Sequence, residues 1–303
     1  KGGIICLTGD NVTIANSKFE LGAVLFKAGK LNETDGGALF VTGDYSTISN
    51  STFIDCTAPN KAGAIMVIGE HTTIEDSLFM RNRAGGPTAG QGGAIYWQGN
   101  NGKIHNMTGL INIAVGGPGD TKGGNIFISG SDVVIEESLF NMTSAAYGGS
   151  IYVEGNNVNI TTSTFTQSPS QKAGGGVYVS GNSTLIKDSD FSRLNSTYGG
   201  SIYIEGDNAT LDNVSSMMTF ARHGGAIFVE GNNASILNSD IKMSNATSAN
   251  GIDGEGGAVY IQGNHSLINN TSISMSNSDE NGGALYVSGD YGRLYNSNFT
   301  KRA

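Results

Sequence analysis

Three glutamates are the side chains of this sequence whose type and spacing come closest to a catalytic arrangement. Glu154, Glu205 and Glu230 recur at the same place in a repeated pattern. Two carboxylates about 5–5.5 Å apart are what a retaining glycosidase uses, so Glu205 and Glu230 in adjacent repeats are candidates for such a pair. They are identical positions of one repeat, however, with no other group placed opposite them. We therefore assign no catalytic residue and expect that the chain is not an enzyme.

Metal-binding chemistry has weak support in the sequence. The four histidines (His71, His105, His223 and His265) are scattered and show no metal-ligand spacing. Charged residues do accompany the glycine-rich turns of three long segments, namely Arg81 with Arg83, Asp120 with Lys122, and Asp253 with Glu255. None of these segments has the spacing of an EF-hand loop. We expect no metal and no cofactor, with calcium at these segments as a weak alternative.

A column of aromatic residues is the strongest candidate for ligand binding. An aromatic residue stands between two aliphatic ones in nearly every repeat, and we take as binding candidates Tyr96, Tyr152, Tyr178, Tyr203, Phe228, Tyr260 and Tyr286. If the aliphatic neighbours point inward, the rings point outward, where small flanking residues would leave a shallow trough for sugar rings or another protein. The alternative is that the rings stack on one another and are roofed by long loops.

The elements that position these residues follow from a fixed period. The pattern G-G-small-aliphatic-aromatic-aliphatic-x-G begins eleven times, at positions 2, 36, 62, 92, 123, 148, 174, 199, 224, 256 and 282. Within each copy apolar residues alternate with period two, which predicts short strands and no helix. Strands of this length cannot bury a core alone but can do so when stacked one per coil. The sequence predicts an all-β, right-handed parallel β-helix of about eleven coils with three parallel sheets, forming one domain over residues 1–303.

Side-chain orientation in the coils also follows from the repeat. Five residues after each closing glycine comes an aliphatic residue, such as Ile160, Ile186 and Leu211, which we expect to point inward. An Asn or Asp two residues later is expected at a corner, where it tolerates the left-handed region and bonds to its copy in the next coil. Corner glycines are expected to supply positive φ. Trp97 is the one very large residue in an inward column. All variation in repeat length falls before the next G-G pair, which places the long loops along one edge.

Composition limits the partners of the chain. The net charge is −9, and only 14% of residues are charged. An acidic surface gives no reason to bind nucleic acid or an anionic membrane, and no apolar run of 18 residues exists to insert into one. Cys6 and Cys56 are too few for a disulfide framework, and whether they pair stays open. Because the sequence starts inside a repeat, we expect it to be a fragment of a longer surface protein.

The repeat GGAIYxxG-NNxTIxNSxF resembles that of adhesin-like surface proteins of methanogenic archaea, which have a pectin-lyase-like β-helix fold. It is less similar to chlamydial polymorphic membrane proteins, whose FxxN motif is matched only at Phe79–Asn82. The first resemblance implies an extracellular, cell-surface stalk that attaches to a glycan or protein on another cell. Two alternatives remain: a structural protein that assembles with itself end to end, and a carbohydrate-active enzyme of the same fold.

Sixteen N-x-S/T sequons agree with an extracellular setting, although a repeat rich in Asn, Ser and Thr also generates such motifs without selection. Asn195 and Asn245 are expected to lie in variable loops, so they are the better candidates for glycosylation.

Overall fold

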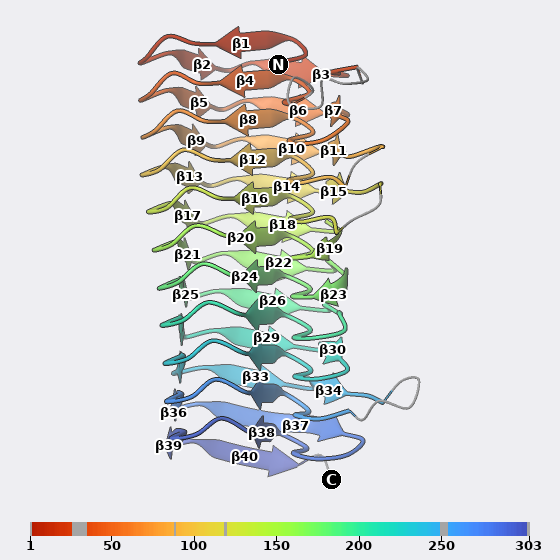
Figure 1. The fold of residues 1–303 in the computed structure, drawn as a ribbon, viewed down its shortest axis with the longest axis vertical. Helices are drawn as coiled ribbons and strands as arrows, with labels where there is room; N and C mark the ends of the chain where they lie inside the picture. The colour runs from red at the N-terminus through yellow and green to blue at the C-terminus, as the bar shows by residue number, and fades with distance from the viewer. Residues whose placement is uncertain (1, 26–34, 88, 118–119, 249–253, 302–303) are drawn as a thin grey trace.

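The chain forms a rod of stacked coils, seen in a computed structural model that describes residues 2–25, 35–87, 89–117, 120–248 and 254–301 (Figure 1). The coils follow one another in chain order from one end of the rod to the other. All paired strands run parallel and in register, with irregularities in two of the pairs. The predicted parallel β-helix is confirmed.

The first sheet contains the G-G-small-aliphatic-aromatic-aliphatic segments. Its strands within the described residues are β1 (Ile5–Leu7), β4 (Leu39–Val41), β8 (Ile65–Val67), β12 (Ile95–Trp97), β16 (Ile126–Ile128), β20 (Ile151–Val153), β24 (Val177–Val179), β27 (Ile202–Ile204), β31 (Ile227–Val229), β35 (Val259–Ile261) and β38 (Leu285–Val287). Most of these strands are buried at every residue, so both faces of the first sheet are covered.

The second sheet carries the inward aliphatic column. Its described strands are β2 (Thr13–Ala15), β5 (Thr47–Ser49), β9 (Thr73–Glu75), β13 (Lys103–His105), β17 (Val134–Glu136), β21 (Asn159–Thr161), β25 (Leu185–Lys187), β28 (Thr210–Asp212), β32 (Ser235–Leu237), β36 (Leu267–Asn269) and β39 (Arg293–Tyr295). Ile160 pairs with Ile186, and Ile186 with Leu211, so like residues stack on like as the repeat predicts.

The third sheet carries the inward phenylalanines. Its described strands are β3 (Lys18–Glu20), β6 (Thr52–Ile54), β10 (Leu78–Met80), β14 (Thr108–Leu110), β18 (Leu139–Asn141), β22 (Thr164–Thr166), β26 (Asp190–Ser192), β29 (Ser215–Met217), β33 (Asp240–Lys242), β37 (Ser272–Ser278) and β40 (Asn298–Lys301). Phe140, Phe165 and Phe191 stack with ring centroids 4.9 and 4.6 Å apart, because parallel in-register strands repeat at about 4.8 Å.

A fourth row of short strands lies along one side of the rod, on the right in Figure 1. These edge strands are β7 (Thr57–Ala58), β11 (Arg83–Ala84), β15 (Ile113–Ala114), β19 (Ala145–Tyr147), β23 (Ser170–Ala173), β30 (Phe220–Ala221) and β34 (Asn245–Ala246). The sequence assigned these segments to loops. These segments nevertheless pair with one another. Each comes directly after a strand of the in-register third sheet, so the equivalent segment of the next coil lies beside it.

The corner after the second sheet is built as predicted. Asn16 and Asn50 have φ of 52° and 43°, and the Asn50 side-chain amide donates to Asn16 Oδ1. Asn106 donates to Asp76 and Asn213 to Asp188 in the same way. The ladder of corner side chains is therefore a structural device, since it satisfies polar groups that the left-handed turn leaves free.

Glycine has two different roles at the other corners. The first glycine of the G-G pair, for example Gly36 with φ of 71°, has the expected positive φ. The closing glycine has no positive φ, so that part of the prediction is wrong. A Cβ on Gly155 would lie 1.8 Å from the carbonyl oxygen of Gly130, and close approach of successive coils is the reason a glycine stands there.

Trp97 points inward and is fully buried, as predicted. Its indole nitrogen donates to the Gly99 carbonyl oxygen at 2.9 Å. A side chain at Gly102 would clash with the indole ring, so the small residue makes room for the large one.

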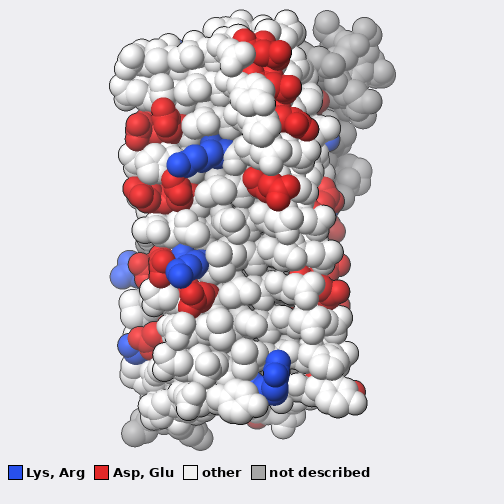
Figure 2. Space-filling view, turned by 90° about the vertical axis from the view of Figure 1, so that its left-hand side faces the viewer, with Lys and Arg blue, Asp and Glu red and all other residues white. Residues whose placement is uncertain are grey.

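The outer surface of the rod is sparsely charged. On the long side shown in Figure 2, acidic and basic side chains lie in small separate groups on a mostly uncharged surface. On the second sheet, the Lys103 ammonium pairs with the Glu136 carboxylate at 2.6 Å. Burial in the core and stacking of successive coils thus hold the rod together more than surface ion pairs do.

Candidate functional site

The aromatic column stacks along the outer side of the first sheet. Neighbouring ring centroids from Tyr96 to Tyr286 are 4.7 to 5.3 Å apart and the rings are nearly parallel. The rings lie outside the inner core, as the alternation predicts. Most are nevertheless buried, with Tyr178 only 7% exposed, and Tyr203 and Tyr286 are half-buried. The column is therefore not an open trough over most of its length: the rings stack and are covered, as the alternative expected, although not by the long loops. Ligand binding by these rings stays a prediction.

The cover comes from the residues just before each G-G pair. These residues pair from coil to coil, and we call them the roof column: Lys61, Gln91, Lys122, Tyr147, Ala173, Tyr198, His223 and Glu255. The Lys61 ammonium lies 4.2 Å from the centre of the Tyr96 ring, and that of Lys122 lies 4.4 Å from the Tyr152 ring. Cation–π attraction and aliphatic contact let lysine cover an aromatic ring while its charge stays hydrated.

Two tyrosines continue the roof column where the lysines stop. The ring of Tyr147 meets that of Tyr178 edge-on at 5.3 Å and 80°. Tyr198 meets Tyr203 at 72° and Phe228 at 75°. Edge-to-face contacts of this kind are favourable for aromatic rings. They orient the rings of Tyr147 and Tyr198 nearly perpendicular to the rings of the aromatic column.

Between these two tyrosines the roof column has a gap. Ala173 pairs with Tyr147 on one side and Tyr198 on the other, and its methyl group is too short to cover the rings below. A cavity of about 240 Å³ results, which we call the aromatic cavity; it is lined by Tyr147, Lys172, Ala173, Tyr178, Thr197, Tyr198 and Tyr203. This cavity reaches two of the rings that the sequence analysis selected, Tyr178 and Tyr203.

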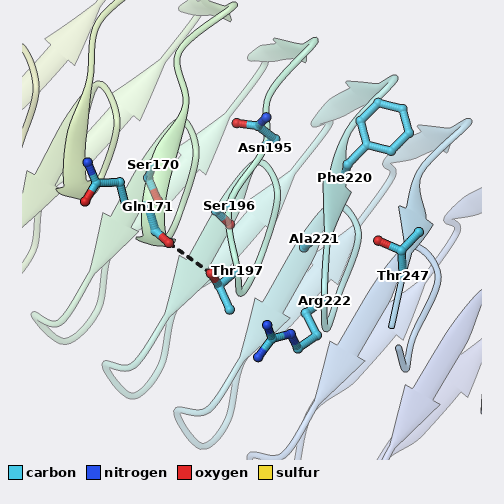
Figure 3. Close-up of a pocket in the computed structure, with 9 residues that line it drawn as sticks. All are labelled: Ser170, Gln171, Asn195, Ser196, Thr197, Phe220, Ala221, Arg222 and Thr247. Atoms are coloured by element: carbon cyan, nitrogen blue, oxygen red, sulfur yellow. Dashed lines mark hydrogen bonds between the residues drawn. The ribbon is translucent and has the colours of Figure 1, made fainter. Parts of the chain in front are cut away.

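A second cavity of about 390 Å³ adjoins the first, and Thr197 lines both. We call it the polar cavity; its lining residues, labelled in Figure 3, are Ser170, Gln171, Asn195, Ser196, Thr197, Phe220, Ala221, Arg222 and Thr247. They come from the edge strands β23, β30 and β34 and the residues beside them. Phe220 is 45% exposed, and Thr197 Oγ1 donates to the Gln171 carbonyl oxygen at 2.9 Å. Together the two cavities form the groove.

The charged side chains that line the groove are basic, and the carboxylates of Asp120, Glu205 and Glu230 lie just behind the lining, bonded to Lys172, Tyr178 and Tyr203. Arg222 and Lys172 are the charged residues that line it, and the described lining contains no Asp or Glu. Lys172 is paired with Asp120 at 2.5 Å and also lies 5.3 Å from the Tyr147 ring centre. The Arg222 Nε is buried and has no hydrogen-bond partner among the described residues.

The candidate carboxylates bond to the aromatic column. Tyr178 Oη donates to Glu205 Oε2 at 2.7 Å, and Tyr203 Oη donates to Glu230 Oε2 in the next coil. Burial raises the pKa of both tyrosines, and the hydrogen bond to a carboxylate raises it further. Glu205 and Glu230 thus serve as acceptors that fix the phenols of the groove floor.

The other polar candidates lie apart from the groove or on its rim. His71 stacks on Tyr45 at 4.7 Å and His265 on Tyr291 at 4.8 Å, both at a corner. No three His, Cys, Asp or Glu side chains gather as a metal site within the described ranges. Arg81 binds Asp55 at 2.8 Å. Asp253 lies outside the described residues, and the calcium alternative stays a prediction.

The two glycosylation candidates stand in one column with Phe220. Asn195 pairs with Phe220, and Phe220 with Asn245 in β34. The expected position in a variable loop is therefore wrong for Asn245, which lies in β34, whereas Asn195 lies between β26 and β27, outside the strands. Asn195 is exposed and lines the polar cavity, whereas Asn245 is half-buried. Glycosylation itself stays a prediction.

The two cysteines are free in the structure. Cys6 is exposed at the aromatic position of the first coil and Cys56 is buried, and burial raises the pKa of the Cys56 thiol to about 11. Cys6 pairs with Phe40 of the next coil, so it begins the aromatic column.

The roof column and the polar cavity escaped the sequence analysis. Tyr147, Ala173, Tyr198, Phe220 and Arg222 fall in segments treated as loops of variable length. One signal was available: the residue before each G-G pair is at a constant position, and reading down that column gives Lys, Gln, Lys, Tyr, Ala, Tyr, His and Glu from residues 61 to 255. The single alanine in that series marks the gap.

Comparison with known proteins establishes the family. The family model of the right handed beta helix region matches residues 2–192, more than half of the chain. The chain therefore belongs to the right-handed β-helix family. No curated protein matches the sequence.

Three solved structures are similar to this chain at low sequence identity. They are the alginate lyase AlyF-OU02 (16% identity, TM-score 0.49, 88% of this chain and 58% of that one), the DFA-IIIase from Arthrobacter chlorophenolicus (12%, 0.43, 90% and 82%), and a mutant tailspike protein of E. coli bacteriophage HK620 in complex with a pentasaccharide (11%, 0.49, 99% and 67%). The chain thus spans less than two thirds of the alginate lyase.

These comparisons correct one expectation. The sequence analysis expected no enzyme, yet an alginate lyase and a DFA-IIIase are among the solved structures found to be similar. That expectation is therefore withdrawn. Separately, none of the described elements is a helix with the length and hydropathy of a membrane span.

Proposed function

We propose that this chain is an extracellular, adhesin-like β-helix stalk that binds a glycan of another cell or surface in the groove. The observation that carries the proposal is the gap at Ala173. It opens the aromatic column between Tyr147 and Tyr198, at the place where a cavity lined by amides and hydroxyls adjoins it.

The chemistry of the groove matches the two faces of a sugar. The C–H groups of a pyranose pack against aromatic rings, and Tyr147 and Tyr198 offer rings from the walls of the cavity. The floor rings present their edges, because their faces stack on one another. The hydroxyl groups of the sugar need donors and acceptors in fixed places, and Gln171 and Asn195 offer both. Ligand sites commonly combine an aromatic lining with a few convergent polar groups in this way.

Rigidity of the site favours binding. The walls are held by parallel strands on both sides, and the floor tyrosines Tyr178 and Tyr203 are fixed by Glu205 and Glu230. A site whose side chains are already ordered loses little conformational entropy when the ligand arrives. A β-helix rod also holds its side groove away from its ends, which suits attachment at a distance from a cell surface.

The test fills the gap. Tyrosine fits the backbone of the roof column at positions 147 and 198, so Ala173→Tyr is expected to fold and to occupy the aromatic cavity. A glycan array screened with the wild-type chain is expected to show binding that Ala173→Tyr abolishes. The control is Gln91→Tyr, which adds the same side chain to the roof column outside the groove, and it is expected to retain binding.

Two results would count against the proposal. One is a wild-type chain that binds no glycan on the array. The other is equal glycan binding by the wild type and by Ala173→Tyr, when Ala173→Tyr and Gln91→Tyr both unfold at the wild-type temperature.

A further inference from the structure

Arg222 gives the polar cavity a charge that a neutral glycan does not require. Its guanidinium lines the cavity beside Thr197 and Thr247, as Figure 3 shows. The chain around it has a net charge of −9, yet the described lining of both cavities holds two cations and no anion.

The hydrogen bonding of Arg222 also favours an acidic ligand. Its Nε is buried and lacks an acceptor within the described part of the chain. Because that atom is buried, a ligand in the cavity would meet the terminal nitrogens of the guanidinium instead, and this pair of donors also matches the two oxygens of a carboxylate or sulfate group.

Lys172, the second cation of the groove, already has an ion-pair partner. Lys172 lies at the rim of the aromatic cavity and is already paired with Asp120, at 2.5 Å. Its charge is therefore partly neutralised before any ligand arrives. Of the two, Arg222 is the group whose bonding capacity remains open.

The neighbours of Arg222 define where the acidic group would lie. Phe220 is 45% exposed and begins β30, which ends one residue before Arg222, and Asn195 pairs with Phe220 from the preceding coil. A sugar ring packed on Phe220 would place its substituents between the Asn195 amide and the Arg222 guanidinium. The aromatic cavity beyond Thr197 would hold the adjoining residue of the oligosaccharide.

We infer that the groove selects an acidic glycan, with Arg222 binding the carboxylate or sulfate of one sugar residue in the polar cavity. This inference rests on the proposed function, because it assigns a ligand class to the same groove. It adds a specificity-determining residue that the gap at Ala173 does not require.

The experiment compares matched ligands. Titration calorimetry measures binding of a uronic-acid oligosaccharide, its methyl ester and a sulfated oligosaccharide of equal length to the wild-type chain. At least one acidic ligand is expected to bind tenfold or more tightly than the methyl ester. That preference is expected to shrink as salt concentration rises, because ion pairs at a partly exposed site are screened.

Variants assign the preference to one residue. Arg222→Gln is expected to lose the tenfold preference and to bind the methyl ester as the wild type does, whereas Arg222→Lys is expected to keep only part of it, because lysine lacks the paired donors. Arg193→Gln removes one positive charge at an exposed corner outside the groove and is the matched control, expected to keep the preference.

The outcomes separate the two claims. Equal preference in Arg222→Gln and Arg193→Gln overturns the inference. Binding of the methyl ester alone, abolished by Ala173→Tyr, overturns the inference and supports the proposed function. A wild-type chain that binds none of the three ligands, with no other glycan bound on the array, overturns both.

Discussion

The inner core and the outer aromatic column are built by the same repeat but end in different surroundings. Inside, Phe140, Phe165 and Phe191 stack between sheets whose positions the coil fixes. Outside, Tyr152 and its neighbours stack at the same spacing under the roof column, whose residues differ from coil to coil. The closed coil leaves no spare room in the core. A roof-column residue, by contrast, can differ in size from one coil to the next, and the groove lies where the small residue Ala173 stands in that column.

Removing one ring from each stack is expected to give the largest difference. Phe165→Ala should lower the free energy of unfolding by about 3–5 kcal/mol, because the closed core cannot collapse into the space. Phe127→Ala should cost less, because the flexible Lys122 above it can move inward. Calorimetric unfolding of both variants measures the difference. Equal losses would show that the outer column is as closed as the core.

The phenol–carboxylate bonds of the groove floor are expected to have a smaller, pH-dependent effect. The folded pKa of Tyr178 and Tyr203 lies above the unfolded value of 10.0, so the folded chain holds these protons more tightly. The stability that this contributes is fully present below pH 10 and declines as the pH rises above it. Tyr178→Phe should cost about 0.5–1.5 kcal/mol at neutral pH.

Thermal unfolding at several pH values from neutral to alkaline tests this sign. The double variant of Tyr178→Phe and Tyr203→Phe should lose less stability above pH 10 than the wild type. An alkaline decline as steep in the double variant as in the wild type would assign the effect to other groups.

Opening the roof column elsewhere is expected to have the smallest effect on stability. Lys122→Ala removes the ammonium that lies 4.4 Å from the Tyr152 ring, at a cost of about 0.5–1 kcal/mol. Tyr152 should then become accessible, and nitration followed by mass spectrometry measures its reactivity. Unchanged reactivity of Tyr152 would mean that the lysine does not act as a cover.

Features that recur in every coil were predictable from the sequence. The file of Ile160, Ile186 and Leu211 followed from a constant spacing, because in-register stacking places like on like. The ladder from Asn16 to Asn50 followed from a polar residue at a constant corner. Buried Trp97 followed from its place in an inward column.

Features that depend on one coil covering another were not predictable in the same way. The alternation placed Tyr178 on the outer side of its strand but could not say what lies above that side. Edge strands such as β30 and β34 have two residues each, too few to show a period of two. The groove therefore went unnoticed, and Phe220 and Arg222 with it.

The sequence by itself determined the repeat, the direction in which each side chain of a strand points and the stacking of like residues, because these depend on positions along the chain. Only the tertiary structure decided which outward side chains are exposed. The exposure of each outward ring depends on the size of the roof-column residue above it. Ala173 is too small to cover the rings beneath it.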